Sequence, residues 1–390
     1  MRRALESAAR GRGAVEPNPM VGAVIVRHGE LLAEGWHRRF GGPHAEAEAL
    51  AAARSGGAEV RGATVYVTLE PCVAFPGKRT PACSEALIEG GVRRVVVAMA
   101  DPHPQVAGKG IGRLQAAGVH VDVGICEPEA RALLAPYTKL TTRGRPWVIC
   151  KWAQTRDGYL ALPDDRWVTG EPARRRVHKI RAFCDAVLVG IGTVLADDPL
   201  LTNRSGAGRR PARVVLDSHL RTPPDSQLGA TAGEHSLIVV AAEGATDTTP
   251  EAADALRNAG AHILELPAGS GGVSLAALLD ELGGRGWTNL LVEGGPKVLA
   301  SFLRQGLADE LDVFISPDYA GVTPEIRGGA PSSPDIRGGA PGLSRRVPAG
   351  GSEPTLPRFD IANVATAQTM APEIEQLGRD EMRRYVLTKP

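Results

Sequence analysis

Residues 43–46 of this chain have the sequence Pro-His-Ala-Glu, residues 70–72 have the sequence Glu-Pro-Cys, and a further cysteine follows at position 83. One imidazole and two thiolates supply three zinc ligands and leave the fourth tetrahedral position open to water, as catalytic zinc sites require. We therefore predict that His44, Cys72 and Cys83 hold one Zn²⁺ ion. The alternative is a buried cysteine pair with an unrelated surface histidine, the usual situation for isolated residues of these types.

Glu46 follows the predicted ligand His44 closely enough to reach a metal-bound water without binding the metal itself. The order H-x-E, then P-C and a second cysteine, is typical of zinc deaminases, in which the glutamate moves the proton. Zinc lowers the pKa of bound water toward about 7, and the resulting hydroxide attacks an amidine-like ring carbon. We predict Glu46 as the catalytic group that takes this proton and returns it to the leaving ammonia.

Around these motifs, short β-branched runs alternate with helical segments. Residues 21–26 and 65–69 favour strands, whereas the alanine-rich residues 44–54 and the segment after Cys83 favour helices. Strands that alternate with helices predict a largely parallel sheet covered on both faces. His44 and Cys83 then stand at helix N-termini, whose positive end stabilises the thiolate form that a metal needs.

The length of the chain predicts two domains, because 390 residues exceed the roughly 250–300 at which one hydrophobic core stops growing. The polar, turn-prone residues 141–146 interrupt the alternation, which then restarts with several further predicted strands. We therefore predict one α/β domain at 1–143 and another at 147–390. Within the second, residues 324–341 contain two near-copies of a Gly/Pro-rich segment, which predicts an exposed, mobile insertion at 322–350 without an assigned function.

Charge and apolar patterning exclude several classes of protein. Lys and Arg total 45 against 44 Asp and Glu, a formal net charge of +1, so no overall field draws the chain to nucleic acid or to an anionic membrane. No run approaches the roughly 18–20 apolar residues of a membrane span, and no apolar signal core follows the first residues. The five cysteines form an odd, sparse set, which indicates reduced thiols. We expect a cytoplasmic protein with no nucleic-acid or membrane partner.

In its motifs the chain resembles a known family, the bifunctional riboflavin-biosynthesis deaminase/reductases. The first half resembles the deaminase half of that family in Asn-Pro-Met-Val-Gly-Ala at 18–23, Gly-Trp-His at 35–37, Gly-Pro-His-Ala-Glu at 42–46, Thr-Leu-Glu-Pro-Cys at 68–72, Thr-Pro-Ala-Cys at 80–83 and Ala-Asp-Pro at 100–102. The second half resembles the reductase half at residues 151–158, 167–170, 189–202, 216–218, 293–295 and 306–311. The resemblance extends from residue 1 to about residue 321.

This resemblance implies a fold, two activities and two cofactors. The first domain would be a cytidine-deaminase-like α/β/α sandwich, and the second a dihydrofolate-reductase-like α/β domain. With Zn²⁺, the first would remove an amino group from the pyrimidine ribotide 2,5-diamino-6-(5-phosphoribosylamino)pyrimidin-4(3H)-one by hydrolysis. With NADPH, the second would reduce the ribosyl side chain to ribityl. A homo-oligomer, dimer or tetramer, is expected of the family.

Further site residues are implied by the resemblance alone. Those that match NADPH contacts are Ala153, Trp167, Thr193, Asp197, Ser218 and the turn and helix at 295–301, namely Gly295, Pro296, Lys297, Val298, Leu299, Ala300 and Ser301. Those that match substrate contacts are Asp165, Arg181, Leu201, Arg204 and Glu293. The guanidinium forks of Arg181 and Arg204 suit a ribose phosphate. The Glu-Gly-Gly-Pro segment at 293–296 follows a predicted strand and opens a helix whose N–H groups suit a phosphate.

Two departures from the family pattern bear on the substrate. The histidine that most members carry shortly after the first zinc cysteine is absent after Cys72, which leaves Lys78 and Arg79 as candidates to face the substrate phosphate. Asp165 stands where many members have a serine, and its carboxylate would repel a phosphate. The alternatives are therefore a paralogue that acts on a related aminopyrimidine, and a reductase whose deaminase half is only a scaffold. A nucleic-acid base deaminase is disfavoured by the neutral charge and the attached second domain.

Overall fold

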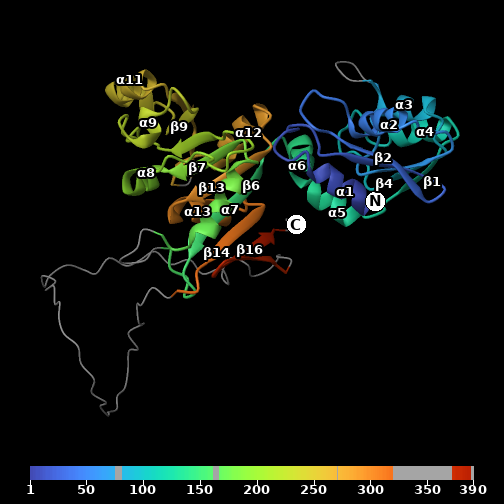
Figure 1. The fold of residues 1–390 in the computed structure, drawn as a ribbon. Coiled ribbons are helices and arrows are strands. Elements are labelled where there is room, and N and C mark those ends of the chain that lie inside the picture. Colours follow the sequence, from blue (N-terminus) through green and yellow to red (C-terminus); the bar gives the residue numbers. More distant parts are fainter. Residues whose placement is uncertain (75–80, 161–166, 270, 319–370, 388–390) are drawn as a thin grey trace, which may run out of the picture.

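The computed structural model describes residues 1–74, 81–160, 167–269, 271–318 and 371–387. It forms two α/β halves that lie side by side and are joined at α6 (Ala135–Arg143) (Figure 1). Three predictions fall outside the described residues: the phosphate contacts of Lys78 and Arg79, the substrate contact of Asp165, and the Gly/Pro-rich insertion at 322–350. Among the described residues, no helix combines the length and the apolar composition needed to cross a bilayer.

The N-terminal half is a five-stranded sheet with helices on both faces. Its elements, in chain order, are α1 (Arg2–Ala9), β1 (Gly22–Arg27), β2 (Glu30–Trp36), α2 (Ala45–Ser55), β3 (Thr64–Val67), α3 (Cys83–Glu89), β4 (Arg94–Val97), α4 (Lys109–Ala116), β5 (His120–Val123), α5 (Glu127–Leu133) and α6. The strand order is β2-β1-β3-β4-β5. β3, β4 and β5 run parallel, as predicted, whereas β1 is antiparallel to both of its neighbours. The tight hairpin at His28 and Gly29, both with positive φ, makes β1 and β2 antiparallel, because a short turn can join only antiparallel strands.

Glycines bring two helices onto opposite faces of this sheet. A Cβ at Gly22 would lie 2.0 Å from a carbonyl oxygen of α1, and a Cβ at Gly35 would lie 2.3 Å from the amide nitrogen of Ala49 in α2. Gly35 pairs with Ala23 across the strands, and Ala23 follows Gly22, so the two glycines face opposite sides. α1 and α2 therefore enclose the sheet as the predicted α/β/α sandwich, and α2 begins directly after His44.

The C-terminal half is built on a nine-stranded sheet. Its elements are β6 (Trp147–Gln154), α7 (Glu171–Arg181), β7 (Ala186–Gly190), α8 (Ile191–Asp197), β8 (Ala212–Leu216), α9 (Gln227–Ala230), β9 (Leu237–Ala242), α10 (Ala245–Thr248), α11 (Pro250–Asn258), β10 (His262–Leu266), β11 (Ala268–Gly269), β12 (Gly272–Val273), α12 (Leu275–Gly284), β13 (Asn289–Gly294), α13 (Pro296–Arg304), β14 (Glu310–Ile315), β15 (Glu373–Leu377) and β16 (Asp380–Val386). The strand order is β10-β9-β8-β7-β13-β6-β14-β16-β15, parallel from β10 to β14 and antiparallel at β16 and β15.

Both faces of this second sheet are buried. Alternate residues of β6 contribute to one core, in which Val148 and Trp152 pack with leucines of α12 and α13, while Ile149 and Ala153 face a core that includes α7, α8 and α11. This arrangement confirms the predicted α/β architecture of the second half. The strands β15 and β16 were not predicted, because charged residues recur along both and β15 lies exposed at the edge.

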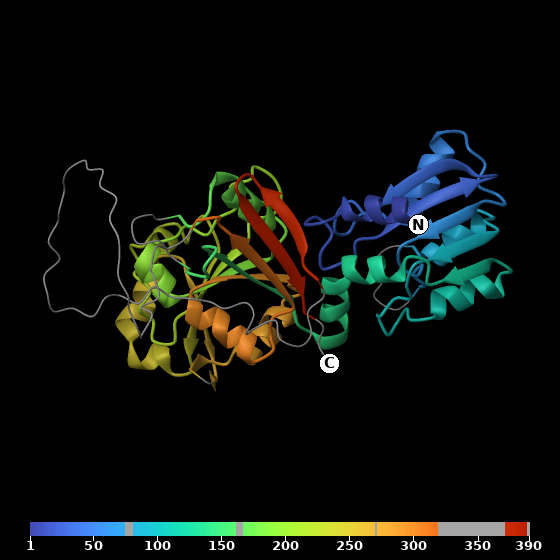
Figure 2. The ribbon, with the colours of Figure 1, turned by 90° about the horizontal axis from the view of Figure 1, so that it is seen from below.

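The two halves meet at the amino-terminal ends of the parallel strands of the second sheet (Figure 2). Lys139 of α6 forms a buried ion pair with Asp309, which directly precedes β14. Arg209, which precedes β8, contacts the loop around Gly13. The predicted cofactor residues Thr193 and Gly295 follow β7 and β13 at their carboxyl-terminal ends. The predicted cofactor residues therefore lie at the end of the second sheet opposite to the end that the N-terminal half contacts.

Candidate functional site

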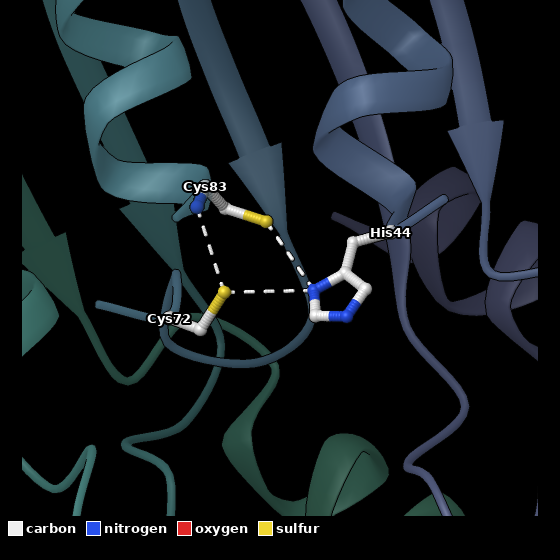
Figure 3. A group of neighbouring side chains, drawn as sticks. All are labelled: His44, Cys72 and Cys83. Carbon is white, nitrogen blue, oxygen red and sulfur yellow. Dashed lines mark hydrogen bonds between the residues drawn. The ribbon is translucent and has the colours of Figure 1, made fainter. Parts of the chain in front are cut away.

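The three predicted metal ligands converge on one point. Nδ1 of His44 lies 3.5 Å from Sγ of Cys72 and 3.4 Å from Sγ of Cys83, and both sulfurs face the imidazole (Figure 3). A tetrahedral zinc with Zn–S of about 2.3 Å and Zn–N of about 2.0–2.1 Å separates sulfur from nitrogen by about 3.6 Å. The donor set and its spacing therefore fit a zinc ion. Within the described ranges, this is the only group of three or more potential metal ligands with donor atoms within 4.8 Å of one another.

Local structure explains why these side chains meet. His44 is the N-cap of α2 with extended backbone, and Cys83 is the first residue of α3. Cys72 follows β3, and its sulfur lies 3.5 Å from the amide nitrogen of Cys83, which donates to it. The hydrogen bonds from Cys83 and His44 lower the pKa of the Cys72 thiol below its ordinary value. This environment therefore favours the thiolate that binds metal.

Glu46 lies on the first turn of α2, beside the ligands. Its side chain is buried, and the residue is only 3% exposed. Burial, together with the nearby Cys72, raises the pKa of its carboxyl to about 7. A carboxyl group in this range can both accept and donate a proton at neutral pH, which is what proton transfer requires.

Glu70 holds the strand end that carries Cys72. Its buried carboxylate accepts four backbone N–H groups from the facing loop and helix: Asp101 at 3.1 Å, Gly108 at 2.9 Å, Gly110 at 2.8 Å and Ile111 at 3.2 Å. This bonding fixes the Glu-Pro-Cys segment against α4. No role was predicted for Glu70, because its partners are backbone groups that no side-chain pattern marks.

Two further residues without a predicted role, Asn18 and His37, form hydrogen bonds beside the ligand His44. Nδ1 of the buried His37 lies 2.8 Å from the carbonyl oxygen of Pro43 and donates to it, because a carbonyl only accepts. Burial lowers the pKa of His37, so the ring is neutral and its Nε2 accepts from the Asn18 amide at 3.3 Å. The rings of His37 and His44 lie edge to face, with centroids 5.5 Å apart. Asn18 and His37 therefore fix the backbone immediately before the metal ligand.

In the C-terminal half, two glycine-containing turns lie against each other. The Gly295 amide donates to Oγ1 of Thr193 at 3.0 Å, which joins the turn before α13 to the first turn of α8. A Cβ at Gly190 would lie 2.7 Å from Cγ2 of Val298, so that strand end is close to α13. The structure thus brings together Thr193, Gly295 and Val298, all predicted cofactor contacts. Close backbone turns at the carboxyl ends of neighbouring parallel strands suit a dinucleotide.

Two predicted substrate residues, Arg181 and Glu293, form a buried ion pair. Nε and Nη2 of Arg181 donate to the two carboxylate oxygens of Glu293 at 2.5 and 2.9 Å, and Nη1 donates to the Thr202 carbonyl at 2.9 Å. Nζ of Lys151 is 4.0 Å from the same carboxylate. Burial alone would raise the pKa of Glu293, but the charges of Arg181 and Lys151 lower it to about 2. Glu293 is therefore a fixed carboxylate at every physiological pH.

The remaining predicted substrate residues lie on the segment after α8. Leu201 is buried with a positive φ of 55°, and Arg204 is exposed with its Nε 3.3 Å from Nε2 of His178.

The other predicted cofactor residues surround the strand ends. Trp167 is half exposed and stacks with the guanidinium of Arg174, whose centre is 4.9 Å from the ring. Ala153 is partly buried on β6, Asp197 ends α8, and Ser218 follows β8. On α13, Pro296 and Lys297 are exposed, Ala300 and Ser301 are partly buried, and Leu299 is buried. These roles remain predictions.

Two protein-family models match the chain. Residues 146–337 match the RibD C-terminal domain, and residues 1–99 match the cytidine and deoxycytidylate deaminase zinc-binding region. Among curated proteins, the riboflavin biosynthesis protein RibD of Aquifex aeolicus is 41% identical over 324 residues, 82% of this chain and 87% of that protein. RibD of Escherichia coli strain K12 is 40% identical over 336 residues, 82% of this chain and 88% of its own length.

Solved structures resemble the whole chain. RibD of Acinetobacter baumannii has a TM-score of 0.75 at 33% identity and covers 100% of this chain and 98% of its own. A diaminohydroxyphosphoribosylaminopyrimidine deaminase/5-amino-6-(5-phosphoribosylamino)uracil reductase of Thermotoga maritima has a TM-score of 0.76 at 32% identity, with coverage of 100% and 97%. The similarity therefore extends over both halves at once.

Proposed function

The chain belongs to the RibD family of riboflavin-biosynthesis enzymes, bifunctional zinc deaminases and NADPH-dependent reductases, and from that premise we propose which residues carry each activity. The N-terminal half removes an amino group from 2,5-diamino-6-(5-phosphoribosylamino)pyrimidin-4(3H)-one by hydrolysis, and the C-terminal half reduces the ribosyl side chain to ribityl. The observation that supports the first assignment is the convergence of one imidazole nitrogen and two sulfurs with the spacing of a zinc site.

In the deaminase half, His44, Cys72 and Cys83 hold the metal, His44 through Nδ1. A zinc ion held there would supply an acidified water. Glu46 would carry a proton from water to the departing amine as the new C–O bond forms and the C–N bond breaks, so that the products are a ring carbonyl group and ammonia. The burial of Glu46 keeps bulk water from its carboxyl group. The intact ligand triad supports an active deaminase rather than a scaffold.

In the reductase half, the cofactor NADPH supplies the hydride. Thr193 and the turn and helix at 295–301 hold its phosphates, and Ala153, Trp167, Asp197 and Ser218 contact the rest of it. These assignments follow the family resemblance and are supported by the bond between Thr193 and Gly295.

The substrate of the reductase half meets a fixed carboxylate. We assign Glu293 to a hydroxyl group of the ribosyl chain, since an ionised carboxylate accepts hydrogen bonds strongly. Arg181 holds Glu293 in place through both of its oxygens, while Leu201 and Arg204 contact the ribotide. Asp165, outside the described residues, is assigned to the substrate by the resemblance alone.

We also propose a homo-oligomer, dimer or tetramer, in the cytoplasm. The family resemblance supports the oligomer, and the exposed Ile374 on the edge strand β15 offers an apolar contact for a second chain. The need for reduced Cys72 and Cys83 supports a reducing compartment.

The experiment that tests the function offers the diaminopyrimidinone ribotide to the purified protein, with and without NADPH, and identifies the products by mass. We expect release of ammonia without reductant, followed by a gain of two hydrogens when NADPH is added. Protein stripped of zinc by a chelator, then reloaded, is the control for the first step. Reduction without any ammonia release would reject the deaminase assignment and favour the scaffold alternative.

A further inference from the structure

A loop of the N-terminal half, residues 11–18, packs against the segment that leads to the ligand His44. The Phe40 amide donates to a carbonyl oxygen of the loop, that of Ala14, at 2.8 Å. A Cβ at Gly11 would lie 2.7 Å from the carbonyl oxygen of His37. The amide of Asn18, at the end of the loop, bonds to the His37 ring. The position of the 11–18 loop therefore sets the position of residues 37–43.

One side chain of the C-terminal half, Arg209, fastens this loop. Its Nε donates to the Gly13 carbonyl at 2.9 Å, and its Nη2 donates to the Glu16 carbonyl at 3.0 Å and lies 3.3 Å from the Glu16 carboxylate. Its Nη1 forms an ion pair with Asp185. The other oxygen of the Glu16 carboxylate accepts the Gly13 amide at 2.9 Å. Arg209 thus links both ends of the turn at residues 13–16 to the second half.

On the side of the second half, Arg209 is held by Asp185, whose own position is fixed by backbone hydrogen bonds. Asp185, which directly precedes β7, also accepts the amides of Thr288 and Asn289 at 2.8 and 2.9 Å, where β13 begins. The side chains of Glu16 and Asp185 are only 5% and 10% exposed. Carboxylates this buried depend on their cation, because an unpaired buried charge is costly. Arg209 therefore ties the loop to two central strands of the reductase sheet.

Val15 of the loop is buried in a core of the N-terminal half, but a cavity of about 340 Å³ interrupts the packing between the loop and the second half. Glu16, Asn18, Phe183 and Asn289 are among the residues that line this cavity. The contacts that remain include the stacking of Arg12 on Phe183, with the guanidinium centre 5.7 Å from the ring centroid. Where apolar packing is incomplete, the polar link carries a larger share of the positioning.

We propose that Arg209 is a positioning residue for deamination: it fastens the 11–18 loop to the reductase sheet and thereby fixes His37 and Pro43 before the ligand His44. The inference rests on the proposed function of the N-terminal half. Its consequence is that the deaminase site depends on a residue of the reductase half. Substitutions along such a contiguous chain of contacts change a remote site by roughly 3- to 30-fold.

The test compares Arg209→Gln, Glu16→Gln and the double variant with wild type. Arg145→Gln is the matched control, since it removes a bidentate arginine–carboxylate pair with Asp280 on a different surface. Deaminase kcat and KM are measured by ammonia release at equal zinc content, and reductase kinetics by NADPH oxidation on the deaminated ribotide.

We expect each single variant to lower the deaminase kcat/KM by roughly 3- to 30-fold with unchanged zinc content. The deaminase kcat/KM of the double variant should be no lower than that of the more affected single variant, because both substitutions disrupt the same contact between Arg209 and the loop. Glu16→Gln and Arg145→Gln should leave reductase kinetics unchanged. Wild-type deaminase kinetics in Arg209→Gln, or an equal loss in Arg145→Gln, would overturn the proposal.

Hydrogen exchange supplies a readout that does not depend on either activity. In Arg209→Gln the amide of Phe40, bonded to the 11–18 loop, should exchange faster, while the amides of β3 keep their protection. Unchanged exchange at Phe40 would overturn the proposal even if activity fell. Failure of the wild-type protein to release ammonia would instead reject the proposed function, and the exchange result would still decide whether Arg209 positions the loop.

Discussion

The metal centre of the N-terminal half and the cofactor side of the C-terminal half are constructed by different means. At the first, three side chains of fixed chemical type converge within 4.8 Å. At the second, backbone turns at Gly190 and Gly295 lie together, and the main charged group is a carboxylate already paired with Arg181. A metal site requires particular side-chain donor atoms, whereas a dinucleotide site requires a fitting backbone shape and backbone N–H donors. Single substitutions should therefore abolish the first activity but only weaken the second.

The largest effect is expected for Cys83→Ser, which removes one of the three predicted zinc ligands. Loss of one of three protein ligands should remove stoichiometric zinc and bring ammonia release to the detection limit, because the open-site geometry needs all three. The reductase half should keep its kinetics, since its predicted cofactor site lies at the end of the second sheet away from the N-terminal half. Metal content by plasma emission and NADPH oxidation on the deaminated ribotide check both statements. Retention of full zinc and deamination would remove Cys83 from the ligand set.

Glu46→Gln separates metal binding from proton transfer. The amide keeps the shape of the side chain but cannot move a proton, so we expect a fall in deaminase kcat of roughly 10²–10⁴-fold with zinc content unchanged. Ammonia release and metal analysis on the same sample provide the measurement. Turnover at the wild-type rate would rule out Glu46 as the proton carrier.

Glu293→Gln tests the buried ion pair of the reductase half through the pH dependence of the unfolding free energy. The pKa of Glu293 is about 2 in the folded chain against an ordinary value of 4.5. A depressed pKa gives stability that is fully present above pH 4.5 and is lost as pH falls through about 2, and the difference corresponds to about 3 kcal/mol of unfolding free energy.

Denaturant titrations between pH 7 and pH 2 measure this effect. The unfolding free energy of wild type should fall more steeply below pH 4.5 than that of Glu293→Gln, which starts lower because its buried Arg181 has lost its partner. Parallel curves for the two proteins would show that the ion pair contributes no pH-dependent stability.

Thr193→Val should have the smallest effect. It removes the acceptor of the Gly295 amide but keeps the shape of the side chain, and a single neutral hydrogen bond is worth about 0.5–1.5 kcal/mol. We expect the KM for NADPH to rise by roughly three- to tenfold with little change in kcat, as measured in steady-state assays. A KM for NADPH equal to that of wild type would reject the assignment of this turn to cofactor binding.

The sequence was most informative where chemistry restricts residue type. His44, Cys72 and Cys83 could be recognised because few residues bind zinc and their order is distinctive. The parallel strands β6 to β10, β13 and β14 could be located because β-branched runs bounded by turns have few other uses. β15 and β16 could not, since charged residues recur along both and β15 is an exposed edge strand.

Long-range pairing was the main feature that the sequence did not reveal. Arg181 and Glu293 were both predicted as substrate contacts, but nothing in the sequence marks the ion pair that they form. The role of Glu70 depends on backbone amides of residues 101–111, and that of Arg209 on carbonyl groups of the other half. Such partners are set by how the elements pack, and no local pattern marks them.

The most direct test of the central claim is zinc K-edge X-ray absorption on the wild-type protein, with Cys83→Ser as reference. The account predicts two sulfur ligands at about 2.3 Å together with nitrogen or oxygen ligands at about 2.0–2.1 Å. The variant, purified in the same way, should give no stoichiometric zinc signal. A wild-type spectrum that contains only nitrogen and oxygen ligands, or purified protein that retains no zinc, would contradict the assignment of His44, Cys72 and Cys83 as the metal centre.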